Sequence, residues 1–218
     1  SISGKHVGTF GDIGTFSFFG NKVITCGEGG AVIFNDLDTY HKAKVLRDHG
    51  MTPGKRYWHD VVGFNYRLTN LQAAVGCAQF EQLDGFREKR KQIFSWYEKY
   101  LLTSSFFDLQ TLFDGYESSY WLFTVRLKAH NLIERDNLVE KLAKLGIDTR
   151  PVFYPMSHMP PFKACKKYLA GVSDIISATG ISLPTSVYLT EEDIIKISEE
   201  ILSCIDSSVQ LNKVLHNA

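Results

Sequence analysis

The sequence has no net charge and no long apolar run. It contains 24 Lys and Arg residues against 24 Asp and Glu residues, so it has no overall basic field of the kind that attracts nucleic acid or an anionic membrane. No apolar run approaches the length of a membrane span, and the first residues lack the basic start and apolar core of a signal peptide. We therefore expect a cytoplasmic protein that binds neither nucleic acid nor a membrane.

The sequence also lacks closely spaced cysteine and histidine ligands. Its four cysteines form no C-x-x-C motif, and the chain is too long to depend on disulfides, so we expect reduced thiols. Among the seven histidines, His49, His59 and His158 invite a metal interpretation, but their spacing fits no short ligand motif. No metal site is predicted.

The composition that remains is that of an ordinary globular protein. With 44% apolar and 22% charged residues, the chain lies near the globular averages, which disfavours disordered, collagen-like and coiled-coil classes. A length of 218 residues allows one large domain or two small ones.

The first half of the chain is predicted to mix strands and helices. Residues 15–19, 23–24 and 31–34 are β-prone and separated by glycine turns, which predicts three short strands. A helix is predicted over 37–49, with Gly50 as its C-terminal stop.

A long helical region is predicted to follow. Thr69, with Gln72 three positions later, fits a capping box, and apolar residues then recur at helical steps. We expect one long helix or a kinked pair that ends near Leu102.

The second half is predicted to be a small α/β domain. Residues 120–127 are apolar on both faces, a helix is predicted over 131–145, and residues 147–153 can return as a strand. Thr190 precedes an acidic first turn and an amphipathic pattern, which predicts a terminal helix.

Lys22 is the residue whose surroundings point to chemistry. Most lysines lie at the surface, but Lys22 stands between apolar segments in a glycine-rich stretch, which predicts partial burial. Burial favours the neutral amine, the form that attacks carbonyl groups to make Schiff bases. The hydroxyl of Ser17 could reach a phosphate through the same turn. The alternatives are a surface lysine and a serine that simply alternates with phenylalanines on a strand.

Several ordered blocks resemble the DegT-type (DegT/DnrJ/EryC/StrS) pyridoxal-phosphate-dependent sugar aminotransferases. The blocks extend over almost the whole chain, and together they are far more specific than any one of them. They are Phe16-Ser17-Phe18, Lys22, Gly27-Glu28-Gly29-Gly30, Leu46-Arg47-Asp48-His49-Gly50, the segment from Gly63 to Ala74, Tyr120-Trp121, the segment from Thr149 to Pro155, and Ile181-Ser182-Leu183-Pro184.

The resemblance implies a cofactor site. Lys22 would hold pyridoxal 5'-phosphate as a Schiff base, be released by the amino donor, and then move a proton between donor and cofactor carbons. Ser17 would donate to the cofactor phosphate. Asn65 would reach a phosphate across the interface of a homodimer with shared active sites. Asn65 as a plain turn residue is the alternative.

The resemblance also implies a substrate. Arg150, His158 and Arg67 would face a nucleotide-sugar, and a guanidinium can pair with a diphosphate bidentately. An exposed arginine at a strand end is the alternative for Arg150. The block Arg150 to Met156 is most similar to the branch that makes perosamine and related 4-amino-4,6-dideoxyhexoses. Lys22 argues against the dehydratase branch, which has histidine at this position.

The implied reaction is transamination of a nucleotide-linked 4-keto-6-deoxysugar, with glutamate as amino donor, in the synthesis of lipopolysaccharide or antibiotic sugars. The implied fold is α/β, the fold-type I class of aspartate aminotransferase. Residues 1–102 would be the C-terminal part of a large cofactor domain, and residues 103–218 a small α/β domain. The resemblance implies that a further part, with an aspartate for the cofactor ring nitrogen, would precede these residues in the parent protein. Two other interpretations remain open: a noncatalytic fragment that needs a separate N-terminal piece, and a plain nucleotide-binding module.

Overall fold

The computed structural model describes residues 1–128, 132–168 and 171–216. The chain forms two compact units. The first unit consists of Ser1–Arg87 with Leu112–Ser119, and the second of Glu88–Thr111 with Tyr120–Ala218. The domains expected at 1–102 and 103–218 stay a prediction. Within the described ranges, no helix is both long and apolar enough to cross a membrane.

A two-stranded hairpin is the centre of the first unit. Strand β1 (Ile13–Ser17) pairs antiparallel with β2 (Gly30–Phe34), so that Ser17 lies opposite Gly30. A short 3-10 helix, Val7–Thr9, lies beside β1. The third strand expected at 23–24 is wrong, because those residues belong to the loop that joins β1 to β2.

Glycines allow the main chain to pass close to itself at this hairpin. A Cβ atom on Gly14 would lie 1.9 Å from the carbonyl oxygen of Gly8, and one on Gly30 would lie 2.3 Å from that of Phe16. Both distances are far below van der Waals contact, and main-chain atoms cannot yield cheaply. Glycine is therefore required at both positions by space.

The helices of the first unit begin at side-chain caps. In α1 (Leu37–Arg47), the carboxylate of Asp36 accepts hydrogen bonds from the Thr39 hydroxyl and backbone N–H, which lower the pKa of Asp36. The helix ends at Arg47, two residues before the predicted end, and both His49 (φ +61°) and Gly50 (φ +73°) after it are in the left-handed region.

The capping box predicted for α2 (Asn70–Phe80) is confirmed. Thr69 Oγ1 accepts from the N–H of Gln72 at 3.2 Å, and Gln72 Oε1 accepts from the N–H of Thr69 at 3.0 Å. Helix α3 (Leu83–Leu101) begins after a short break, so the expected long helix is a pair of helices.

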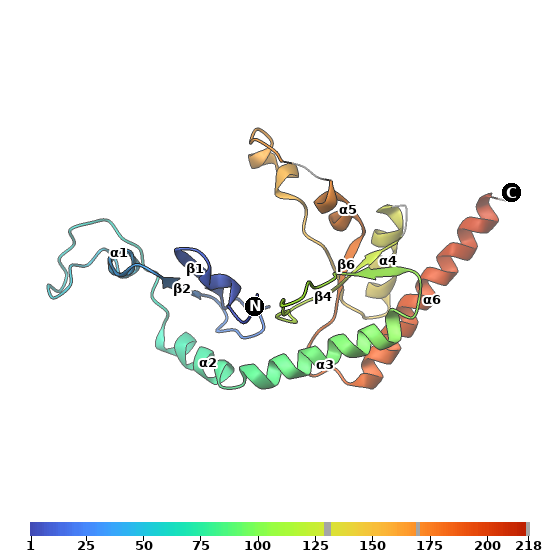
Figure 1. Ribbon diagram of the computed structural model, residues 1–218, viewed down its shortest axis with the longest axis horizontal. Helices are drawn as coiled ribbons and strands as arrows, with labels where there is room; N and C mark the ends of the chain where they lie inside the picture. The colour runs from blue at the N-terminus through green and yellow to red at the C-terminus, as the bar shows by residue number, and fades with distance from the viewer. Residues whose placement is uncertain (129–131, 169–170, 217–218) are drawn as a thin grey trace. The chain divides into compact units, whose positions relative to one another are not determined.

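The second unit is an antiparallel sheet with helices packed against it (Figure 1). The strand order is β3-β4-β6-β5, and β6 is buried along its whole length. The described elements after α3 are β3 (Phe107–Leu109), β4 (Phe123–Leu127), α4 (Leu132–Lys144), β5 (Arg150–Pro151), 3-10 helices Met156–His158 and Pro160–Phe162, α5 (Val172–Thr179), β6 (Gly180–Leu183) and α6 (Glu191–His216).

The predicted elements of this half are found with different lengths. The strand expected over 147–153 is reduced to β5, whose second residue, Pro151, has no N–H to donate and lies at the sheet edge. The helix start expected at Asn131 lies outside the described residues. Thr190 exchanges hydrogen bonds with Asp193 at the start of α6, as the acidic first turn predicts.

The core of the second unit lies between β4, β6 and helices α3, α4 and α6. Tyr97 of α3 is fully buried, its ring stacks on Phe123, and its hydroxyl donates to the carbonyl of Pro184 at 3.0 Å. Burial raises the pKa of Tyr97 well above its ordinary value. The other helix residues that are buried in this core are Ile93, Leu101, Leu138, Leu142, Ile194 and Ile201.

A buried arginine joins α4 to the end of α5. Arg135 is 5% exposed, and its guanidinium donates to the carbonyls of Ser177 at 2.9 Å and Gly180 at 3.3 Å. Carbonyls in the last turn of a helix have no partner within the helix. Arg135 therefore supplies the donors that the C-terminal end of α5 lacks.

Truncation of the core is expected to destabilise the second unit. Leu142→Ala removes a side chain with no exposed surface and should lower the free energy of unfolding by about 2–5 kcal/mol. The matched change Leu145→Ala, at a side chain that is 51% exposed, should change it by less than about 0.5 kcal/mol. Urea unfolding followed by circular dichroism measures both. Equal losses in the two variants would contradict the assignment of this core.

Loss of the Arg135 guanidinium is expected to destabilise the same unit. Arg135→Met keeps much of the volume but removes the guanidinium donor to the Ser177 carbonyl, whereas the Gly180 carbonyl still accepts from Val152 N–H at 3.1 Å, so the change should cost about 1–3 kcal/mol of unfolding free energy. Lys144→Met, at an exposed position of the same helix, is the control. Thermal unfolding compares the two variants, and an Arg135→Met protein as stable as the control would refute the bridging role.

Candidate functional site

The loop between β1 and β2 holds Lys22. The loop is closed at its base by a hydrogen bond from Phe18 N–H to Gly29 O at 2.9 Å, and across its middle by one from Cys26 N–H to Phe18 O at 3.0 Å. The backbone N–H of Lys22 donates to Phe19 O at 3.0 Å. Lys22 is half-buried, so the expected partial burial is confirmed.

Ser17 is the last residue of β1, directly before this loop. Residues alternate along the strand, with Phe16 half-buried and Ser17 exposed. The Ser17 hydroxyl accepts a hydrogen bond from Phe19 N–H at 3.4 Å and can still donate its own proton to an incoming oxygen. Ser17 therefore does alternate with Phe16 on the strand, which was the alternative interpretation from the sequence. The same alternation leaves the Ser17 hydroxyl accessible directly before the loop that holds Lys22.

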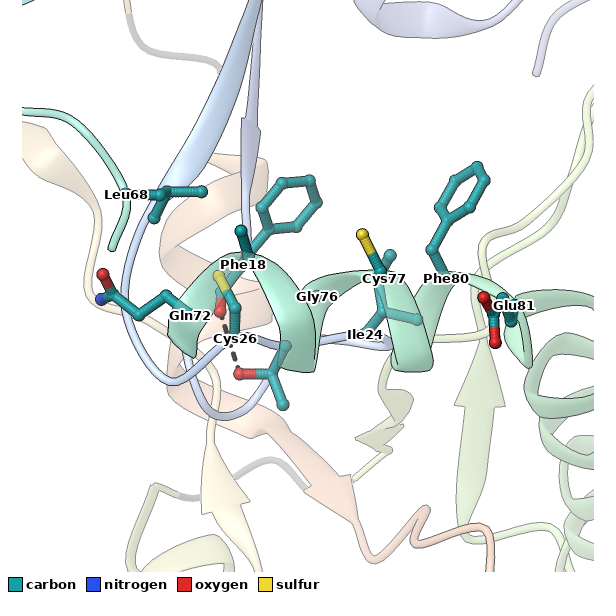
Figure 2. Close-up of a pocket in the computed structure, with 11 residues that line it drawn as sticks. Phe18, Ile24, Cys26, Leu68, Gln72, Gly76, Cys77, Phe80 and Glu81 are labelled. Atoms are coloured by element: carbon teal, nitrogen blue, oxygen red, sulfur yellow. Dashed lines mark hydrogen bonds between the residues drawn. The ribbon is translucent and has the colours of Figure 1, made fainter. Parts of the chain in front are cut away.

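An apolar pocket of about 430 Å³ lies between the same loop and α2 (Figure 2). Cys26 is buried, its thiol donates to Glu28 O at 3.0 Å, and the Thr25 hydroxyl donates to Phe18 O at 2.9 Å. A Cβ on Gly76 of α2 would lie 3.6 Å from the Cβ of Cys26, which is ordinary contact. Helix α2 therefore packs on the loop and fixes its far side.

Asn65 and Arg67 lie on an extended segment that runs beside the end of α1. Asn65 forms an isolated antiparallel bridge with Asp48, and its side chain is exposed. The guanidinium of Arg67 donates to both carboxylate oxygens of Asp48, at 3.2 and 3.4 Å.

Arg150 and His158 lie in the second unit. Arg150 is exposed at the start of β5, opposite Ser182 of β6. His158 ends a short 3-10 helix, and its Nε2 lies 2.8 Å from the carboxylate of Asp174 in α5. The structure thus places Ser17 directly before the loop that holds Lys22, places Asn65 and Arg67 on one extended segment, and places Arg150 and His158 at separate positions of the second unit. The roles of all six residues stay predictions.

Sequence reasoning missed the carboxylates of this site. Asp48 and Asp174 pair with two of the six candidates, yet neither was assigned a role. Asp48 belongs to the block Leu46 to Gly50, which is one of the blocks that resemble the family, and this membership could have marked it as a candidate. Nothing in the sequence marks Asp174. Among the residues that the structure describes, no group of three or more His, Cys, Asp or Glu side chains is arranged to hold a metal ion.

Comparisons with known proteins identify the family. The sequence profile of the DegT/DnrJ/EryC1/StrS aminotransferase family matches residues 1–202. The chain is 42% identical over 196 residues to GDP-perosamine synthase of Caulobacter vibrioides, covering 89% of this chain and 53% of that protein. The chain spans about half the length of the curated relatives it matches.

Solved structures agree with this match. PseC of Helicobacter pylori, an aminotransferase involved in the biosynthesis of pseudoaminic acid, superposes with a TM-score of 0.86 at 26% identity, over 95% of this chain and 57% of that one. The PLP form of the sugar aminotransferase Spr1654 of Streptococcus pneumoniae gives a TM-score of 0.82 at 23% identity, over 95% and 55%, which shows the fold alone. The expected α/β fold, of fold-type I, is confirmed, and the chain belongs to the DegT/DnrJ/EryC1/StrS aminotransferase family.

Proposed function

We propose that this chain provides the lysine-bearing part of a pyridoxal-phosphate-dependent sugar aminotransferase. Pyridoxal phosphate is the cofactor that membership of the family indicates. The observation that carries the proposal is a half-buried lysine on a closed loop, within a chain that matches the family over residues 1–202.

The residues present fit their share of such a cofactor site. A primary amine at Lys22 can bind an aldehyde covalently, and the accessible hydroxyl of Ser17 can donate to a phosphate. Both are attached to one hydrogen-bonded loop and the strand that precedes it. The donor set therefore matches the two ends of the cofactor, its aldehyde and its phosphate.

The chemistry assigned to these residues follows from their functional groups. When bound, the cofactor supplies an electron sink for the negative charge left by removal of a proton from the amino donor. The Nζ atom of Lys22 would hold the cofactor, and after its release the free amine would accept that proton from the donor carbon and return it to the cofactor carbon, two bonds away. Ser17 anchors the phosphate, and Asn65 of a partner subunit would contact it in a homodimer with shared sites.

The proposed substrate is a nucleotide-linked 4-keto-6-deoxysugar, with glutamate as amino donor. Similarity to GDP-perosamine synthases at 39–42% identity supports a sugar of this class. Arg150, His158 and Arg67 are the proposed contacts to the nucleotide-sugar. We further propose a cytoplasmic enzyme of lipopolysaccharide sugar synthesis. The noncatalytic alternative gains no support from the similarity to GDP-perosamine synthases and to the aminotransferase PseC.

Loss of the Lys22 amine is expected to abolish transamination. In the gene-encoded protein, Lys22→Ala should lower the rate of amino transfer to a nucleotide-linked 4-keto-6-deoxysugar by about 10²–10⁴-fold or more, because tether and proton carrier are both lost. The visible absorbance of protein-bound pyridoxal phosphate should disappear as well. Lys42→Ala, at an exposed position of α1, is the control. A Lys22→Ala protein that keeps its colour and activity would rule out the proposed function.

Loss of the Ser17 hydroxyl is expected to weaken cofactor binding. Ser17→Ala removes one hydrogen bond to a charged phosphate and should raise the dissociation constant of pyridoxal phosphate about tenfold. Thr15→Ala is the matched control, because Thr15 is also exposed and lies two residues earlier on β1. Absorbance titration gives both constants. If the two variants lose affinity equally, Ser17 has no specific contact with the phosphate.

A further inference from the structure

Two segments of the first unit cross at a pair of glycines. A Cβ atom on Gly63 would lie 2.1 Å from the backbone nitrogen of Gly50 and 2.5 Å from the carbonyl carbon of His49. A Cβ atom on Gly50 would lie 2.0 Å from the carbonyl oxygen of Val61. Because all three neighbouring atoms belong to the main chain, no side-chain movement can relieve these contacts. The crossing fixes Gly63, and Asn65 lies only two residues beyond it.

Backbone hydrogen bonds continue from this crossing toward Asn65. Phe64 N–H donates to Leu46 O at 2.6 Å, and His49 N–H donates to Phe64 O at 2.9 Å. Tyr66 N–H donates to Arg47 O at 3.0 Å. The residues on both sides of Asn65, Phe64 and Tyr66, are therefore held by backbone hydrogen bonds to the end of α1 and the residues after it.

The pair of Arg67 and Asp48 closes the same crossing on its other side. The guanidinium lies 3.2 Å from the carboxylate, and the side chains are 60% and 31% exposed. Asp48 is the bridge partner of Asn65, so the ion pair joins the residue opposite Asn65 to the residue two positions after it. The Arg67 guanidinium donates to both oxygens of this carboxylate.

The loop that joins the two segments is itself held by hydrogen bonds. Thr52 and Trp58 donate side-chain hydrogen bonds to the carboxylate of Asp60, at 2.7 and 2.9 Å, and they lower the pKa of Asp60. His59 Nδ1 lies 2.9 Å from the carbonyl oxygen of His49. These hydrogen bonds therefore restrict movement of the two crossing segments relative to each other.

We propose that Gly63, Asp48 and Arg67 are positioning residues for Asn65. The close approach of Gly63 to Gly50 fixes the position of the segment just before Asn65, and the ion pair of Arg67 with Asp48 fixes it just after Asn65. The Asn65 amide is thereby held in one position, where it can bind a phosphate. This inference rests on the proposed function, in which Asn65 contacts the cofactor phosphate. It gives Arg67 a positioning role in addition to its proposed contact with the nucleotide-sugar.

The first experiment needs no cofactor. In the ¹⁵N-labelled chain, the side-chain amide signals of Asn65, assigned by their loss in Asn65→Ala, should shift in Gly63→Ala, Asp48→Ala and Arg67→Ala. Arg47→Ala, which removes an exposed positive charge next to Asp48, is the control and should leave them in place. Asn65 signals that are unchanged in the Asp48 and Arg67 variants would overturn the proposal, even if Gly63→Ala fails to fold.

The second experiment is a double-mutant cycle on cofactor affinity in the gene-encoded protein. An exposed ion pair predicts a rise of about two- to fivefold in the dissociation constant of pyridoxal phosphate for Asp48→Ala and for Arg67→Ala. The double variant should be no weaker than either single one, and the exchanged pair Asp48→Arg with Arg67→Asp should recover affinity. Gly63→Ala should weaken binding by about tenfold or more, because main chain must move.

Additive losses in the cycle would overturn the proposal. So would an Arg67→Ala variant that raises only the KM for the nucleotide-sugar while Asp48→Ala changes nothing, since Arg67 would then bind substrate directly. A protein that binds no pyridoxal phosphate at all contradicts the proposed function instead. In that event the Asn65 amide signals still decide whether the crossing positions Asn65.

Discussion

Close passage of one main-chain segment over another is the constraint on which the first unit depends. At Gly14, Gly30 and Gly63, a Cβ atom would lie about 2 Å from atoms of a neighbouring segment. Such approaches leave no room for any other residue type, so space alone explains these three glycines. These glycines bring backbone donors and acceptors of different segments within hydrogen-bond range. Few side chains of the first unit are buried, so these main-chain contacts matter more there.

The two groups of candidate residues follow from these approaches. The approach at Gly30 brings β2 against β1, and the approach at Gly14 brings β1 against the 3-10 helix Val7–Thr9; Ser17 ends β1, and Lys22 lies on the loop that follows it. The contact at Gly63 fixes the segment that presents Asn65. The second unit is built differently, around a buried strand and helices with apolar faces, and its stability rests on packing. In the first unit, the proposed site residues thus lie on segments that main-chain contacts hold in place, whereas the second unit has a conventional core.

What the sequence could predict was local. The capping box of Thr69 and Gln72 spans three residues, and its partners are neighbours whatever the fold, so α2 was predicted with its start. The strand expected at 23–24 failed because hydrogen bonds at both sides of it, such as that of Cys26 with Phe18, fold this apolar stretch into a loop. Pairing of Arg67 with Asp48 depends on how two segments align across a crossing, and no periodicity in the sequence encodes that alignment. Lys22 was singled out by the apolar, glycine-rich stretch around it, and the family blocks then implied its role.

The central claim is that Lys22 is the residue that holds the cofactor. The most direct test is to add pyridoxal phosphate to the gene-encoded protein, reduce it with borohydride, digest it and measure peptide masses. The account predicts one phosphopyridoxyl group, on the peptide that contains Lys22 of the β1–β2 loop. A modification at other lysines with Lys22 unmodified, or no modification at all, would contradict the account.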